Sequence, residues 1–218
     1  MRSTVGRGGR CVVRTDAVGL LLAVGGFLVF ALVWPTVRLW RTQGVMGLTL
    51  HRRKDPLERV VALGMAVFLA AVFAWAVLYA ALGPEPLGLW RLPAWVATAG
   101  WALCGVGSLL TVVAQAQMGA SWRIGIDEQP TGLVTRGLFG GMRNPIFTGM
   151  LLVLAGVVLV TPCAWTVMAW VDALLLISLQ ARLEERHLLK LHGEAYRGYA
   201  SRVGRFVPGV GRLSSGAA

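Results

Sequence analysis

The chain has 218 residues, of which 56% are hydrophobic and only 14% are charged. A soluble domain usually carries about a quarter charged residues, so this composition argues against an ordinary soluble protein and indicates a membrane protein. The formal net charge of +11 would suit either nucleic acid or an anionic lipid surface. The basic residues lie in the gaps between apolar runs, which favours the lipid bilayer as partner and not nucleic acid.

Three apolar segments without a charged residue fill the first half of the chain. They span residues 17–37, 60–82 and 93–118, and each is long enough to cross a bilayer, which takes roughly 20 residues. Four arginines precede the first segment, as in a signal peptide. The run is too long for a signal-peptide core, and no small-residue cleavage site follows it, so we predict a retained helix.

A fourth apolar run, 146–181, is interrupted by Thr161 and Pro162. Proline ends or kinks a helix, so the run predicts a helical hairpin with Pro162 at or near its turn. Its first half is short for a full crossing. Together the segments predict an all-α, polytopic membrane protein with about five transmembrane helices.

The lysines and arginines are unevenly distributed between the two sides that five spans would create. Sixteen of the 21 lie in the segments 38–59, 119–145 and 182–218, which share one side. The positive-inside rule predicts that this side is cytoplasmic, and we expect a bacterial inner (plasma) membrane. The four arginines of the N-terminal tail would then lie outside. A wrongly chosen start codon, or a first segment that does not cross, would each explain this exception.

Two polar segments flank the predicted hairpin and carry most of the residues suited to chemistry. Because a hairpin leaves and re-enters the membrane at one face, we expect the segment before it, 118–147, to touch the segment after it, 180–208. In the later segment, Glu184 and Glu185 follow the last span on what reads as a continuous helix, with Gly193 as its stop. They form either surface salt bridges with neighbouring basic residues or a carboxylate pair that holds a cationic ligand.

In the earlier segment, Asn144 and Pro145 predict a helix start, with Asn144 as N-cap and Pro145 in the first turn. Arg143 then either meets lipid phosphate or belongs to a ligand site, where glycines allow close approach to the backbone. Asp172 lies within the hairpin, and intramembrane acids usually face the bundle interior. It is either a functional residue or a neutral acid that hydrogen-bonds a neighbouring helix. The three cysteines are far apart and indicate free thiols, with neither a disulfide framework nor a metal site.

The segments "GLVTRGLFGGMRNPIFTGM" (132–150) and "LEERHLLKLHGEAYRGYASRVGRFVP" (183–208), with a hairpin between them, resemble the isoprenylcysteine carboxyl methyltransferase family and its bacterial relatives. The resemblance covers about residues 117–208. It implies an integral membrane methyltransferase that uses S-adenosyl-L-methionine at the cytoplasmic face. The domains would be 1–118 with three spans, a methyltransferase-like module 119–208 and a disordered tail 209–218.

By motif position, the resemblance also implies a set of cofactor contacts. They are Leu133, Val134, Phe139, Arg143, Asn144, Pro145, Ile146, Phe147, Glu184 and Glu185. Glu184 would meet the positive end of the cofactor, and Arg143 or backbone N–H groups would meet its carboxylate. Gln180 stands where the eukaryotic enzymes have an arginine linked to substrate, so Gln180 and the nearby Arg182 are the candidate substrate contacts. Asn144 replaces the histidine of many members, which excludes a mechanism that needs an imidazole there.

Three functions remain in competition at this point. The first is transfer of a methyl group to a lipid-like or small apolar acceptor, which is a carboxylate, a thiol or an amine. The second is an NADPH-dependent membrane reductase of the steroid-reductase type, which ends in a related helical module. The third is a non-enzymatic membrane protein. The order of the two quoted segments favours the first. No catalytic residue is assigned, and no metal is expected.

Overall fold

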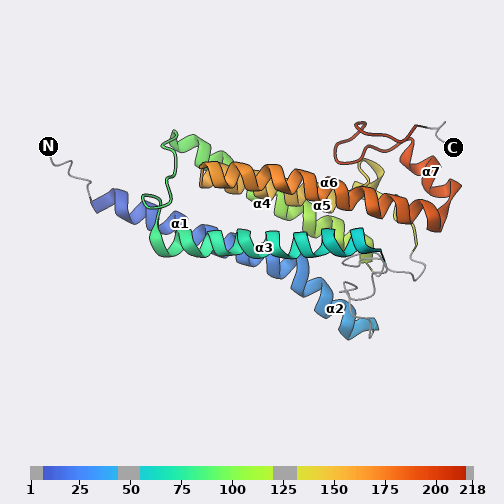
Figure 1. Cartoon of the computed structure of the whole chain (residues 1–218), viewed down its shortest axis with the longest axis horizontal. Coiled ribbons are helices and arrows are strands. Elements are labelled where there is room, and N and C mark those ends of the chain that lie inside the picture. The colour runs from blue at the N-terminus through green and yellow to red at the C-terminus, as the bar shows by residue number, and fades with distance from the viewer. Residues whose placement is uncertain (1–6, 44–54, 120–131, 215–218) are drawn as a thin grey trace.

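The computed structural model describes residues 7–43, 55–119 and 132–214, and these form a bundle of long helices. In chain order they are α1 (Arg7–Leu28), the π-helical η1 (Val29–Val33), α2 (Trp34–Gln43), α3 (Pro56–Leu82), α4 (Ala94–Met118), the short 3-10 helix η4 (Gly137–Gly140), α5 (Pro145–Val160), α6 (Ala164–His192) and α7 (Glu194–Ala200). The helix α1 begins at one end of the bundle, and α7 lies at the other (Figure 1). The prediction of an all-α polytopic fold is confirmed.

Four helical segments are long and apolar enough to cross a membrane: 17–38, α3, α4 and α6. The fifth predicted span is α5, a shorter apolar helix of 16 residues. The hairpin is present, with Thr161, Pro162 and Cys163 between α5 and α6. The backbone N–H of Trp90 donates to the Pro162 carbonyl at 2.7 Å, which ties this turn to the loop that joins α3 to α4.

Helix ends follow the local chemistry of the sequence. Asp55 begins α3 by accepting the Leu57 backbone N–H at 2.8 Å, and Pro56 occupies the first turn. Gly193 ends α6 with a positive φ of 53°, as predicted. The first span differs from the prediction in one respect, because η1 interrupts its α-helical ladder. Gln115 of α4 donates to the Ala31 carbonyl within this π-helix at 2.7 Å.

The helices α4 and α5 pack against each other through small residues. A Cβ built on Gly107 would lie 2.5 Å from the Gly149 carbonyl oxygen, and one on Gly156 would lie 2.6 Å from the Gly100 carbonyl oxygen. The two backbones therefore approach so closely that no side chain fits between them at these positions. Cys104, also in this contact, is a buried free thiol, as is Cys163, in agreement with the sequence.

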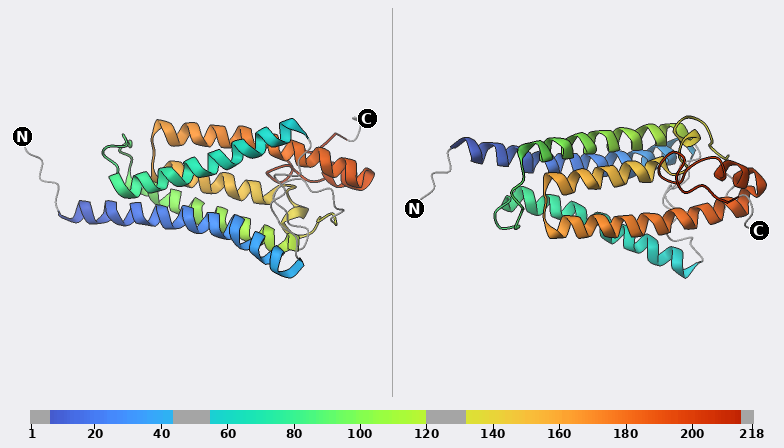
Figure 2. Two further views of the ribbon diagram at one scale, coloured as in Figure 1. Left: turned by 60° about the horizontal axis from the view of Figure 1, so that its bottom comes forward. Right: turned by 90° about the horizontal axis from the view of Figure 1, so that it is seen from above.

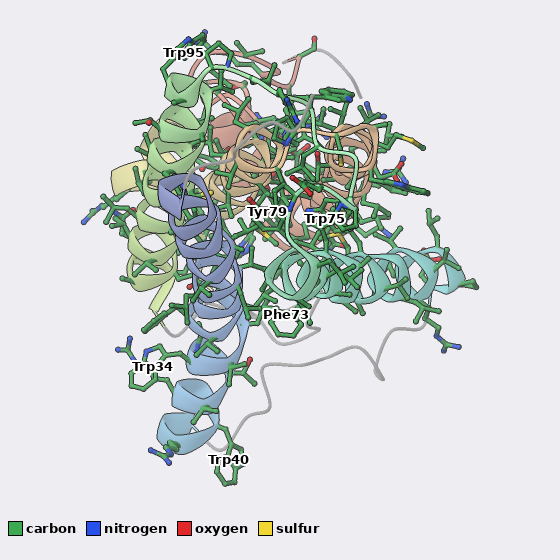
Figure 3. The ribbon with its side chains drawn as sticks, turned by 90° about the vertical axis from the view of Figure 1, so that its left-hand side faces the viewer. Trp34, Trp40, Phe73, Trp75, Tyr79 and Trp95 are labelled. Atoms are coloured by element: carbon green, nitrogen blue, oxygen red, sulfur yellow. The ribbon has the colours of Figure 1, made fainter. Side chains whose placement is uncertain are left out.

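Tryptophans mark both ends of the bundle. Trp34 and Trp40 lie on α2, whereas Trp90, Trp95 and Trp165 lie near the opposite end, and all five side chains are exposed. Figure 3 shows Trp34, Trp40 and Trp95 pointing away from the helices. Exposed tryptophans at two levels are typical of the two membrane–water interfaces. In contrast, Trp75 points inward and donates to the Thr161 hydroxyl at 3.1 Å.

Candidate active site at the end of the bundle

The two polar segments that flank the hairpin meet at the end of the bundle that carries α7 (Figures 1 and 2). The Arg143 backbone N–H donates to the Gly204 carbonyl at 2.8 Å, and the Asn144 N–H donates to the Arg205 carbonyl at 3.0 Å. The chain after α7 therefore runs alongside the residues that precede α5. The predicted contact between the segments before and after the hairpin is present.

Arg143 is the centre of this contact. Its side chain is only 1% exposed, and it pairs with Glu185 of α6 through Nε at 3.1 Å and Nη2 at 3.0 Å. Nη1 donates to the carbonyls of Ala200 and Val203, and Nη2 also donates to the Gly211 carbonyl at 2.9 Å. Each of the three guanidinium nitrogens therefore has a partner within the protein, through four hydrogen bonds and the Nη2–Glu185 ion pair. Arg143 does not lie at lipid phosphate; it is buried and holds the C-terminal segment in place.

Glu185 joins a second arginine to the same cluster. Arg205 donates from Nε to the two carboxylate oxygens at 3.0 and 3.1 Å, and from Nη2 to Oε2 at 2.7 Å. These hydrogen bonds raise the pKa of the Arg205 guanidinium. The Glu185 side chain is 7% exposed, so its charge requires these two partners. The alternative of a surface salt bridge between Glu185 and a neighbour on its own helix is wrong.

Asn144 occupies the N-cap position of α5, but its side chain does not cap the helix. Its Nδ2 instead donates to Glu185 at 3.4 Å and to the Arg205 carbonyl at 3.3 Å. The predicted capping hydrogen bond is therefore wrong, since the amide turns toward the Glu185 cluster. Thr148, one turn later, donates to the Phe206 carbonyl at 2.8 Å and adds another tie to the C-terminal segment.

An aromatic cluster supports the other side of this region. Tyr196 and Tyr199 of α7 are buried, and Leu133 packs against their cluster. The Tyr199 hydroxyl donates to the Phe139 carbonyl of η4 at 2.6 Å. Burial raises the pKa of Tyr199 to about 12 and that of Tyr196 further. Phe139 itself is buried, so η4 is held between α7 and the end of α4.

The end of α4 also fixes the approach to η4. Gly137 has a positive φ of 63°, and a Cβ there would lie 2.5 Å from Gln117 Oε1. The same Gln117 oxygen accepts the Leu138 backbone N–H at 2.8 Å. Only glycine suits this turn, because the backbone conformation and the space both exclude a side chain.

The remaining candidate residues lie around this framework. Pro145 is buried, whereas Val134, Ile146 and Phe147 are half-buried. Glu184 is half-buried and accepts the Gln180 side-chain amide at 2.8 Å. Gln180 is buried, and Arg182 is exposed on the outer side of α6. The structure thus brings together Arg143, Asn144 and Glu185 directly, and places Glu184 one residue away on the same helix.

Three features of the site were missed by reasoning from the sequence. Arg205 lies within the second quoted segment, two residues before Val207, but no role was predicted for it. The two tyrosines of α7 were likewise part of the quoted segment.

The tail 209–218 was predicted to be disordered. This prediction is wrong for the first part of the tail, which is hydrogen-bonded to the rest of the protein. The Gly211 carbonyl binds Arg143, and the Leu213 N–H donates to the Ala200 carbonyl at 3.0 Å. Residues 1–6 of the N-terminal tail and residues 215–218 lie outside the described residues, whereas Arg7, Arg10 and Arg14 of this tail belong to α1.

Two comparisons with known proteins bear on the class to which this protein belongs. Residues 95–195 match the family model described as phospholipid methyltransferase. The match runs from the beginning of α4 into α7 and includes both candidate segments up to Ala195. The resemblance to the isoprenylcysteine carboxyl methyltransferase family is confirmed. No curated protein sequence matches the chain significantly.

The fold is similar to a solved structure of the eukaryotic intramembrane Ras methyltransferase ICMT, an isoprenylcysteine carboxyl methyltransferase. The TM-score is 0.55 at 17% sequence identity, and the alignment covers 89% of this chain and 69% of the other. At this identity the likeness concerns the fold. Together with the family match, it supports a membrane methyltransferase, and nothing in the comparisons favours a reductase.

Proposed function

We propose that the protein is an S-adenosyl-L-methionine-dependent methyltransferase that acts on a lipid-like or small apolar acceptor. The observation that carries the proposal is the meeting of two segments, 133–147 and 180–205, through the Arg143–Glu185 ion pair. The meeting point falls at the end of a region that matches phospholipid methyltransferases.

The residues present suit the charges of this cofactor, which has a sulfonium, an ammonium and a carboxylate. Glu184 is a half-buried carboxylate beside the Arg143–Glu185 cluster and is our candidate for the positive groups. The first turn of α5 leaves the N–H groups of Ile146 and Phe147 without acceptors within the helix, and these suit a carboxylate. Leu133, Val134, Phe139 and Pro145 would provide apolar walls for the remaining atoms.

Arg143 and Glu185 have a different role in this proposal. Because each guanidinium nitrogen of Arg143 is paired within the protein, and Glu185 is held by two arginines, we assign neither residue to the ligand. We therefore regard them as positioning residues that keep the first turn of α5 beside Glu184. Asn144, bonded to Glu185, belongs to the same framework.

The bound cofactor would supply an already activated methyl group, so the protein needs chiefly to position the acceptor and to exclude water. A carboxylate acceptor has no proton to lose, whereas a thiol or amine must release one. Gln180 and Arg182 are the proposed contacts for the acceptor, since both lie where α6 leaves its apolar part.

The site is proposed to face the cytoplasm. The segments 38–59, 119–145 and 182–218 hold sixteen of the 21 lysines and arginines and would share one side of the membrane if all five helices cross it. A basic surface there is attracted to the anionic lipids of the inner leaflet. A lipid-like acceptor could then enter from the bilayer, while the charged cofactor arrives from water.

Calorimetry on detergent-purified protein tests the cofactor directly. We expect S-adenosyl-L-methionine to bind and NADPH not to bind. Glu184→Gln should abolish binding while the protein stays folded by circular dichroism. Glu194→Gln is a matched control, because the Glu194 side chain is 83% exposed and pairs only at the surface with Arg197, so its affinity should equal that of the wild type.

Binding of NADPH alone would overturn the proposed function. Equal affinity of Glu184→Gln and the wild type would overturn the role of Glu184. The acceptor class can be measured by incubating the protein with methyl-labelled cofactor and a lipid extract. Loss of label on mild alkaline hydrolysis identifies a methyl ester, and stable label identifies a thioether or a methylamine.

A further inference from the structure

Asp172 is an acidic residue on the outer surface of a membrane-spanning helix. It is exposed, and it has no hydrogen-bond or ion-pair partner among the residues that the structure describes. The expectation that it faces the bundle interior is wrong. Its neighbour Ala173 is fully buried, so the helix is oriented with Asp172 turned outward.

The depth of Asp172 makes this exposure significant. Asp172 lies eight residues after the start of α6 at Ala164 and ten residues before Arg182. At 1.5 Å per residue these separations are about 12 and 15 Å, so Asp172 would lie near the middle of a hydrocarbon core of about 30 Å. In a helix that crosses the bilayer, a residue at this level would be far from water and from the lipid headgroups on both sides. A carboxyl group facing lipid at the bilayer centre is expensive and normally finds a polar partner.

The surface around Asp172 is a continuous apolar stripe on one face of α6. The residues of this α6 stripe recur at intervals of three and four, as on one side of a helix, and all are exposed: Trp165, Met168, Asp172, Leu175 and Leu179. The helix α6 contacts α5, α3 and α7, and it lies at the outside of the bundle (Figure 2). The stripe is therefore free to pack against another protein molecule.

We infer that the α6 stripe is the interface between two copies of this chain, in which the two Asp172 side chains hydrogen-bond to each other. Two copies in one membrane have the same orientation, so a two-fold axis along the membrane normal brings identical residues together at the same depth. Two carboxyl groups that share a proton satisfy each other, as paired carboxyls do in enzyme sites. Interhelical polar contacts of this kind stabilise helix association in lipid.

The charges at the inner end of α6 predict the geometry of the pair. Arg182 and Arg186 are exposed and continue beyond the stripe, and they would repel their counterparts in a second copy. Packed transmembrane helices cross at an angle, so they diverge away from their point of contact. With the crossing near Asp172, the apolar residues on either side touch, and the arginines separate into water and lipid headgroups.

Crosslinking through one introduced cysteine, in liposomes and in a Cys11→Ser background, tests this geometry. Leu175→Cys and Met168→Cys should form disulfide-linked dimers with mild oxidant. Val67→Cys on α3 and Arg182→Cys should not, although Val67 and Arg182 are as accessible. The protein without an added cysteine, in which Cys104 and Cys163 are buried, measures the background. Crosslinking through Val67 in place of Leu175 would overturn the inference.

The role of Asp172 is measured by dimer dissociation, followed by single-molecule photobleaching over a range of protein-to-lipid ratios. Asp172→Leu should weaken dimerisation by about three- to twenty-fold, the range expected for one interhelical hydrogen bond. Asp172→Asn should stay close to the wild type, because an amide pair can replace the carboxyl pair. A wild type that is monomeric at every ratio, or equal dimerisation of Asp172→Leu and the wild type, would overturn the inference.

Discussion

Replacing Arg143 by methionine should detach the C-terminal segment from the rest of the bundle. Methionine has a similar length and keeps the apolar part of the side chain, but it removes the charge and every donor. Glu185 then loses one of its two arginines, and the carbonyls of Val203 and Gly211 lose the Arg143 donor. The Ala200 carbonyl keeps the Leu213 N–H as its remaining donor.

The size of the effect follows from these contacts. Removing one member of a buried ion pair typically costs about 3–5 kcal/mol. Glu185 keeps Arg205, which lowers this cost, whereas a buried carbonyl without a partner adds about 1–3 kcal/mol until water reaches it. Because the C-terminal segment can open to water, the effects do not add in full. We expect a loss of about 3–5 kcal/mol, most of it local to residues 196–213.

Hydrogen exchange read by mass spectrometry locates the effect. The amides of Arg143, Asn144, Arg205 and Leu213 are hydrogen-bonded to or within the C-terminal segment, and in Arg143→Met the peptides that contain them should exchange faster. Peptides from α4 should be unchanged. Arg197→Met is the matched control, because Arg197 makes a surface ion pair that is worth less than about 1 kcal/mol. If exchange in 196–213 is the same in Arg143→Met and Arg197→Met, the reasoning about Arg143 is refuted.

Two further predictions concern the framework around the site. Tyr199→Phe removes the hydrogen bond to the Phe139 carbonyl and should cost about 1 kcal/mol at neutral pH, measured by denaturant titration in detergent. Because the pKa of Tyr199 is raised from 10 to about 12 in the folded protein, wild-type stability should fall as pH rises from about 10 to 12, and the variant should show a shallower fall. An identical alkaline profile would contradict this. In α5, Gly149→Ala inserts a methyl group against the Thr111 hydroxyl and should cost about 1–3 kcal/mol, whereas Gly105→Ala, with open space at its Cβ, should be neutral or slightly stabilising. Equal melting temperatures for the two variants would show that the α4–α5 contact is not tight.

The elements that were predicted correctly depend on short-range signals. Thr161 and Pro162 interrupt an apolar run and mark the turn of the hairpin, and Pro145 marks the first residue of α5. Gly193 ends α6 because the residue after a helix commonly needs a positive φ. Each signal acts within a few residues, so it can be recognised without knowing what the helix packs against.

The parts that were not predicted depend on backbone partners and on helix rotation. Three acceptors of Arg143 are carbonyl groups of Ala200, Val203 and Gly211, and a carbonyl has the same chemistry at every residue, so no side chain in the sequence identifies them. The outward position of Asp172 has a different cause. The membrane part of α6 is apolar on all sides, and its periodicity therefore does not distinguish the buried face from the lipid-facing one.

The lengths of the two hairpin helices explain why the candidate site forms where it does. The helix α5 has 16 residues and ends at the turn that contains Pro162, whereas α6 has 29 residues and starts from it. Pro145, at the far end of α5, is therefore level with about the sixteenth residue of α6, Leu179. The rest of α6 projects beyond the start of α5 and carries Glu184 and Glu185 past it, so the chain just before Pro145 meets Glu185 through Arg143. A difference in length between two helices thus places a carboxylate pair beside an open helix start, at the level where a bilayer ends.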